Sequence, residues 1–163
     1  MNEIIMRRVK NFALLTALMC AGGMAWAESP HYIKLDESIN TSTFCYVVDL
    51  KEAGLGTATS ITYTLNVTTA CFVAGCANKN GKLVQGTPKS GTSSAASQTT
   101  LPVRNGQTTG TISLCPEAFN LPDPGCTGSQ VLKILGATYT GVSLNDGISV
   151  ENLQDLSAGI ACQ

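Results

Sequence analysis

The stretch Thr59–Cys76 (TSITYTLNVTTACFVAGC) constrains the fold of this chain more than any other part of it. Apolar and polar residues alternate along its first half, and the apolar positions are Ile61, Tyr63, Leu65 and Val67. A period of two is typical of a strand with one buried face. The strand then runs into two cysteines, and a strand that leads directly into disulfides suits the centre of an exported β-domain.

The first 27 residues have the parts of an export signal. A basic start is followed by an apolar run over Phe12–Ala25, and Ala25-Trp26-Ala27 fits the small-x-small cleavage rule. We therefore predict a signal peptide over 1–27 and a single domain over 28–163. Cys20 offers the rival interpretation of a lipid-modified cysteine, but the residue just ahead of it, Met19, is not small. The apolar run is too short for a membrane span, and no later stretch qualifies.

The predicted mature chain is nearly neutral. Removing 27 of the 163 residues leaves seven basic and ten acidic side chains, in a length that suits one domain with its own core. No basic patch is present, so we expect neither nucleic-acid binding nor an anchor to anionic membranes. The signal looks bacterial, and we expect a bacterial protein that is secreted or held at the cell surface, with the periplasm as the alternative.

Six cysteines remain after the predicted cleavage, and their even number in an oxidising compartment predicts disulfides. They are Cys45, Cys71, Cys76, Cys115, Cys126 and Cys162. Six cysteines allow 15 pairings, and the residues alone leave all of them open. A zinc site would need histidine or acidic partners at ligand spacing, and the one histidine, His31, is far from every cysteine in sequence. We therefore expect no cofactor.

Several further segments have strand patterns or turn signals. Strands are predicted over His31–Asp36, Thr43–Leu50, Ser97–Val103, Gln107–Cys115 and Gln130–Leu144, with a last strand or a loose tail over Ile148–Ile160. Thr43–Leu50 and Thr59–Thr69 are expected to pair as an antiparallel hairpin, and Asn105-Gly106 predicts a tight hairpin turn. The small-residue tract Ser90–Ser97 indicates either a loop or a polar edge strand.

This pattern of short strands and recurring turns predicts the fold class. It favours an all-β protein, an antiparallel β-sandwich of Ig-like or jelly-roll outline that disulfides stabilise. A partly closed barrel is the alternative.

Five elements, in order, carry a resemblance to a known family. They are the K-E-x-G-L-G turn in KEAGLGTATSITYTL, ACFVAGCANKNG over Ala70–Gly81, the Asn-Gly hairpin in LPVRNGQTTGTIS, the C-x-G-Q element in CTGSQV, and ATYTGVSLND over Ala137–Asp146. Together they resemble a family of small, uncharacterised secreted bacterial β-rich proteins. The resemblance implies a secreted β-domain but no activity, substrate or site. It favours one disulfide, Cys71–Cys126, and leaves Cys76–Cys115 and Cys45–Cys162 as suggested partners.

No catalytic residue is predicted, and we expect that the protein is not an enzyme. His31 lies in a polar segment and is interpreted as solvent-facing. Three carboxylate pairs could support a secreted hydrolase, the distant alternative. They are Asp36 with Glu37, Asp49 with Glu52, and Asp146 with Glu151, and each is explained as a solvated turn or edge pair. Asp123, Asp146, Glu151 and Asp155 lie in loop-like regions, without the spacing of a calcium-binding loop.

Two kinds of binding role remain open. Phe72 and Phe119 are expected in loops beside cysteines, where they could form a ligand surface for an extracellular polysaccharide, as in a carbohydrate-binding module. Low charge, abundant Thr and Ser, and disulfides also suit a subunit of a surface layer or fibre, in which the protein partners itself by strand exchange or assembly. Glu28–Asn40 is the candidate exchanged strand, unless it completes its own sheet. We therefore expect an exported, non-catalytic β-sandwich that acts in extracellular binding or as a structural component.

Overall fold

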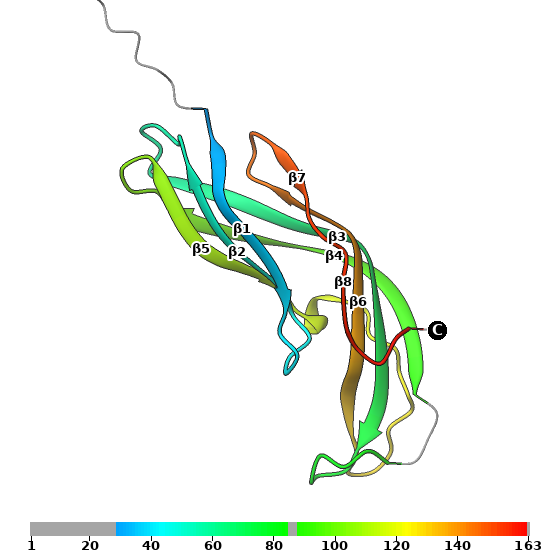
Figure 1. Ribbon diagram of the computed structural model, residues 1–163. Coiled ribbons are helices and arrows are strands. Elements are labelled where there is room, and N and C mark those ends of the chain that lie inside the picture. Colours follow the sequence, from blue (N-terminus) through cyan, green and yellow to red (C-terminus); the bar gives the residue numbers. More distant parts are fainter. Residues whose placement is uncertain (1–28, 85–87, 163) are drawn as a thin grey trace, which may run out of the picture.

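Two antiparallel β-sheets pack face to face (Figure 1). The computed structural model describes residues 29–84 and 88–162, so the predicted signal peptide lies outside the described residues. The three-stranded sheet has the order β1-β2-β5, and the five-stranded sheet has the order β4-β3-β6-β7, with β8 also paired to β6. The strands are β1 (His31–Ile39), β2 (Tyr46–Ala53), β3 (Ser60–Ala77), β4 (Lys89–Pro102), β5 (Gln107–Leu114), β6 (Val131–Asn145), β7 (Val150–Asn152) and β8 (Leu156–Gly159).

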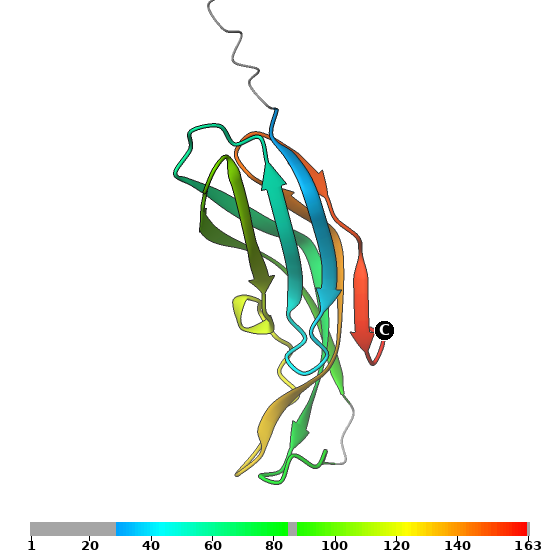
Figure 2. The same cartoon turned by 60° about the vertical axis from the view of Figure 1, so that its left-hand side comes forward.

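The predicted all-β sandwich is confirmed. The described residues contain no α-helix, and the one helical element there is the short 3₁₀ turn η1 (Pro116–Ala118). Sheet β1-β2-β5 lies in front of the longer strands of the other sheet (Figure 2). β1 pairs with β2 over almost its whole length, so the N-terminal segment completes its own sheet.

Strand β3 organises the larger sheet, because β4 pairs along one of its sides and β6 along the other. The period of two predicted for it is confirmed, since Tyr63, Leu65 and Val67 are all buried. Their side chains pack against residues of the facing sheet, including Tyr46, Val48, Leu50, Ile112 and Leu114. Burial of apolar surface between the two layers is the main force that holds the sheets together.

The predicted hairpin of Thr43–Leu50 with Thr59–Thr69 is wrong. β2 pairs with β1 and β5, whereas β3 pairs with β4 and β6, so the two segments lie in different sheets. The connection between them crosses the edge of the sandwich through Gly54 and Gly56, whose φ angles are 78° and 57°. Both strands have apolar inner faces, and alternation alone cannot tell a neighbour in one sheet from a partner in the facing sheet.

The predicted Asn-Gly turn is present, but it joins two sheets. Asn105 and Gly106 have φ angles of 52° and 71°, as a tight turn of this type requires. Arg104 and Gln107 form an isolated bridge across the turn. Beyond that bridge β4 belongs to the five-stranded sheet and β5 to the three-stranded sheet.

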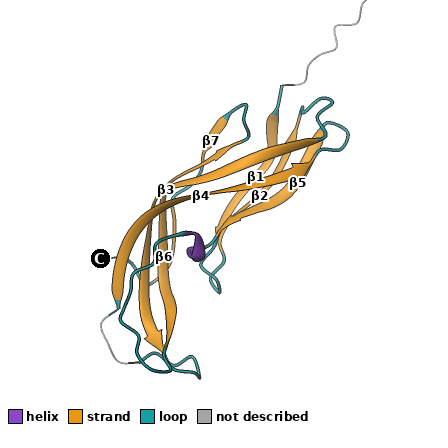
Figure 3. Cartoon of the chain, turned by 180° about the vertical axis from the view of Figure 1, so that it is seen from behind, coloured by secondary structure: helices purple, strands orange, loops and turns teal. Residues whose placement is uncertain are grey.

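The strands β3, β4 and β6 extend well past the end of the three-stranded sheet and curve (Figure 3). β3 therefore runs through both cysteines to Ala77, beyond the predicted end at Thr69. A register shift between Val67 and Ala70 marks a bulge in this strand, and bulges bend a sheet locally. The tract Ser90–Ser97 is an edge strand, the second of the two predicted alternatives, because it pairs with β3.

Candidate functional site: an open sheet edge and a buried acid pair

All six cysteines in the described part of the chain are paired, as predicted, but every predicted partner is wrong. The structure joins Cys45 to Cys115, Cys71 to Cys162 and Cys76 to Cys126. The favoured pair Cys71–Cys126 is absent, and so are Cys76–Cys115 and Cys45–Cys162. In each case the pairing of strands decides which cysteines meet, and the spacing of cysteines along the sequence does not predict that pairing.

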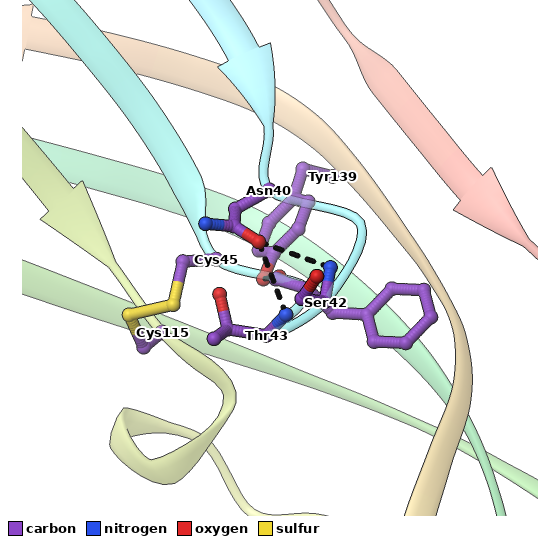
Figure 4. The surroundings of a disulfide bond; sticks show 7 residues. Asn40, Ser42, Thr43, Cys45, Cys115 and Tyr139 are labelled. Carbon is purple, nitrogen blue, oxygen red and sulfur yellow. Dashed lines mark hydrogen bonds between the residues drawn. A yellow bond between two sulfur atoms is a disulfide. The ribbon is translucent and has the colours of Figure 1, made fainter.

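Cys45 and Cys115 meet because β2 and β5 are neighbours. Tyr46 faces Leu114 in the ladder, so the residue before the one and the residue after the other come together, with 4.0 Å between their Cα atoms. The turn that leads into Cys45 is fixed by Asn40, whose Oδ1 accepts hydrogen bonds from the amides of Ser42 and Thr43 at 3.0 and 3.2 Å (Figure 4).

The other two disulfides depend on the neighbours of β3. Cys71 lies opposite Thr138 of β6, and β8 pairs with that same part of β6 just before the chain reaches Cys162. Cys76 lies opposite Leu132 at the start of β6, close to the chain that carries Cys126. One bridge therefore holds the C-terminal strand, and the other closes the far end of the curved sheet.

Phe72 and Phe119 do not form a ligand surface. They are 0% and 7% exposed, and their rings pack against each other with 5.1 Å between centroids. Both also contact Tyr139. The prediction was wrong because β3 continues beyond Thr69, and the bulge between Val67 and Ala70 shifts its alternation by one residue, so that Phe72 faces inward. The segment after η1 also folds back onto that extension of the sheet, where Phe119 meets Phe72.

A buried acid pair joins the two sheets at the end where the described chain begins. Glu52 of β2 is 1% exposed, and Asp146, in the turn between β6 and β7, is 5% exposed. Tyr63 donates a hydrogen bond to Oε2 of Glu52, and Tyr32 donates one to Asp146 at 3.5 Å. These residues come from two different predicted pairs, so sequence reasoning named both carboxylates without bringing them together.

The surroundings shift the pKa values of the two carboxyl groups in opposite directions. Burial raises the pKa of Glu52, against the hydrogen bond from Tyr63, and the charge of Asp146 raises it further. Burial also acts to raise the pKa of Asp146, but the amides of Ser149 and Ile148 donate to its carboxylate and lower the pKa below its usual value. The Oε1 atom of Glu52 accepts no hydrogen bond within the described chain. A proton on Glu52 accounts for this, since the acid can then donate toward Asp146.

A pocket of about 370 Å³ lies beside this pair, lined by Pro30, His31, Tyr32, Leu35, Glu52, Ser149 and Glu151. Opposed pKa shifts in neighbouring carboxyl groups also occur at acid–base catalytic sites. Here the Asp146 oxygens accept the hydrogen bonds that close its own turn, including one from Ser149 Oγ at 3.1 Å. The geometry thus gives each carboxyl group a part in joining β1, β2, β3 and the β6–β7 turn.

The other predicted carboxylate pairs are not brought together as sites. Asp36 forms an exposed ion pair with Lys34 at 2.9 Å, and Asp49 accepts a hydrogen bond from Thr111 on the neighbouring strand. His31 is exposed and lies near Ser29. Within residues 29–84 and 88–162, no group of three or more His, Cys, Asp or Glu side chains is placed to hold a metal ion.

The second feature is the outer edge of β4. Over Gly91–Leu101, which we call the open edge, the backbone pairs with β3 on one side, and among the described residues no backbone hydrogen bond joins it to another segment. The open edge contains no charged residue and no proline. Its outward side chains are Thr92, Ser94, Ala96, Gln98 and Thr100. The inward face is covered near one end, where Pro122 contacts Gly91.

The face beside the open edge is also uncharged and is tied by hydroxyl and amide groups. Thr62 and Thr100 share a hydrogen bond of 2.8 Å across the β3–β4 ladder, and Gln98 donates to Thr64 at 3.2 Å. On the other side of β3, Thr68 donates to the carbonyl of Gly141 at 3.0 Å. The first two of these bonds add to the β3–β4 ladder, and the backbone groups on the far side of β4 form a row of donors and acceptors along the open edge.

Comparison with known proteins identifies no relative: no protein-family model, curated protein or solved structure matches this chain. None of the helical segments in the described residues is long and apolar enough to cross a membrane. The family resemblance proposed from the five sequence elements therefore stays a prediction.

Proposed function

We propose that this chain is a non-catalytic structural component of an extracellular or cell-surface assembly, and that it associates with other protein through the open edge of β4. The observation that carries the proposal is the eleven-residue row from Gly91 to Leu101, which pairs with β3 alone among the described residues and carries no charge. Exposed sheet edges are templates for strand addition, and monomeric proteins blunt them with charges, proline, bulges or short length.

The disulfides support the extracellular part of the proposal. Three bridges tie the sandwich, one of them between Cys71 and Cys162 close to the end of the chain. Such bridges persist in oxidising compartments. They agree with the export signal predicted over 1–27 and with a component that must keep its shape outside the cell.

The structure removes the support for the two alternative functions, a carbohydrate-binding module and a secreted hydrolase. The sugar-binding alternative rested on Phe72 and Phe119 as exposed rings, and both rings are buried. The hydrolase alternative rested on a carboxylate pair, and the pair that does form, Glu52 with Asp146, is buried between the sheets and hydrogen-bonded to the fold. Association through a sheet edge is the role that the remaining surface supports best.

The test is the association state of the chain without residues 1–27. Light scattering after size exclusion, with negative-stain electron microscopy, should show dimers or larger assemblies at micromolar concentration. The double variant S94K/Q98K places two lysines on the outward face of the open edge without touching the core, and it should weaken association at least tenfold, or about 1.4 kcal/mol.

Ser38→Lys is the matched control, since Ser38 is an exposed strand residue on the other edge of the sandwich. It should leave the association unchanged. A protein that stays monomeric at the highest soluble concentration, or one whose assembly responds equally to the Ser38 and β4 variants, would contradict the proposal.

A further inference from the structure

The open edge has a sequence that is compatible with its own antiparallel copy. Its middle residue is Ala96, and the residues at equal distances on either side are small or polar out to Thr92 and Thr100, beyond which Gly91 pairs with Leu101. If two copies of β4 pair antiparallel about Ala96, Thr92 faces Thr100 and Ser94 faces Gln98 on the outward face. Threonine pairs and hydroxyl–amide pairs are favourable across a ladder, and no like charges meet.

We infer that the partner at the open edge is a second copy of this chain, an inference that rests on the proposed function. The two copies are joined through an antiparallel β4–β4 ladder with its two-fold axis at Ala96. The pairing continues the five-stranded sheet into a ten-stranded sheet. A two-fold axis perpendicular to the sheet keeps the outward face of one copy next to the outward face of the other.

The ends of β4 set the limits of this register. Pro102 directly follows the row from Gly91 to Leu101, and Lys89 lies two residues before it. Centred on Ala96, the ladder places Lys89 opposite position 103 and Pro102 opposite position 90, so the charge and the missing N–H both fall at the rim. A register shifted far in either direction shortens the ladder or brings proline inside it, where a backbone donor would be missing.

The second layer of the sandwich is on the same side. β5 is an edge strand of the three-stranded sheet and is linked to β4 by the turn that Arg104 and Gln107 bridge. Leu101 of β4 lies over Gly110 of β5, where a Cβ atom would come within 2.6 Å of it. A second copy at the open edge is therefore flanked by both layers, which adds buried area beyond a single pair of strands.

Single cysteines on the outward face test the register in the full mature protein. Facing residues in an antiparallel ladder have Cα atoms about 4.5–5.5 Å apart, within the reach of a disulfide. With oxidised glutathione as the acceptor of two electrons and two protons, A96C should form a covalent dimer with itself. T92C alone and T100C alone should form far less, whereas an equal mixture of the two should form the mixed dimer.

The outcomes separate this inference from the proposed function. Mass mapping of the three native disulfides shows first that each variant has folded. Equal cross-linking by A96C and by T92C alone would overturn the register. Association that S94K/Q98K weakens, without cross-linking at A96C, would leave the open edge as the interface but overturn the β4–β4 pairing. A monomer in every assay would overturn both.

Discussion

The two long edge strands of this sandwich, β1 and β4, are built on opposite plans. β1 has nine residues, carries Lys34, Asp36 and Glu37, and has a register shift between Tyr32 and Lys34. β4 has fourteen residues, and its open edge has neither a charge nor a shift of its own. Charge and bulges are the devices by which proteins prevent edge-to-edge association. Strand β1 has both charged residues and a register shift, whereas the open edge of β4 has neither.

The difference extends to what surrounds each strand. On the β1 side, Tyr32 donates to Asp146, the acid pair joins the two sheets, and β8 adds a short strand that Cys162 holds through Cys71. On the β4 side the cover lies over the inward face, from the segment after η1, and leaves the backbone edge open. Side-chain contacts and the neighbouring strand β8 therefore surround β1, whereas among the described residues the backbone edge of β4 pairs with β3 alone.

The largest effect on stability is expected from removing the Cys71–Cys162 disulfide, which holds β8 against β6. The double variant C71S/C162S removes a bridge with a sequence separation of 91 residues, and on the chain-entropy model this destabilises the fold by about 4.6 kcal/mol. β8 then loses its covalent hold, and the edge of β6 that it covers becomes accessible. We expect a lower free energy of unfolding in guanidinium and a new association that S94K/Q98K does not suppress.

The matched control is C76S/C126S, which removes the bridge at the far end of the curved sheet and has a sequence separation of 50 residues. Its loss of stability should be similar in size, because the closure entropy changes slowly with loop length. It should not create the new association, since β8 stays in place. New association in both variants would show that instability, and not the edge of β6, is the cause.

The features that sequence reasoning predicted are local ones. The alternation at Tyr63, Leu65 and Val67 is a property of consecutive residues, and so is the positive φ that Asn105 and Gly106 accommodate. The all-β fold, the long strand β6 and the presence of disulfides follow from signals of the same kind. Each needs only the chemistry of a few neighbouring residues.

The features that it missed depend on which strands become neighbours. Cys45 finds Cys115 because β2 pairs with β5, and Glu52 finds Asp146 because the two sheets face each other there. Neither spacing carries that information. For Ser90–Ser97 the sequence indicates either a loop or a polar edge strand, since a tract of small residues has weak strand propensity of its own. It becomes a strand because β3 offers a ladder.

A smaller effect is expected in how stability depends on pH, because of the buried pair Glu52 and Asp146, which links β1 to the rest of the sandwich. The pKa of Glu52 is raised above 4.5 in the folded state, so its contribution to stability is complete below that pH and is lost as the pH rises through the raised pKa. Glu52→Gln keeps the shape and can donate toward Asp146 at any pH. We expect its melting temperature to match that of the wild type near pH 4 and to exceed it increasingly up to pH 8.

Asp146 should show the opposite sign. Its pKa is lowered from 3.8, so the stability it contributes is present above that value and is lost as the pH falls through the lowered pKa.

The control for Glu52→Gln is Glu151→Gln, which removes a charge from the exposed side of the same pocket, with no pH-dependent gain expected. A difference between Glu52→Gln and wild type that is flat from pH 4 to 8 would contradict the raised pKa of Glu52.

The smallest effect tests whether charge is what closes the β1 edge. Lys34 and Asp36 form an exposed ion pair, with side chains 52% and 66% exposed, so K34T/D36T should leave the melting temperature unchanged. Made in the S94K/Q98K background, where the open edge is blocked, it should restore a weak, few-fold increase in association, because of the three charges on β1 only Glu37 then remains. No restored association would mean that the register shift and β8 close this side without the charges, and that an uncharged sequence alone does not make the β4 edge adhesive.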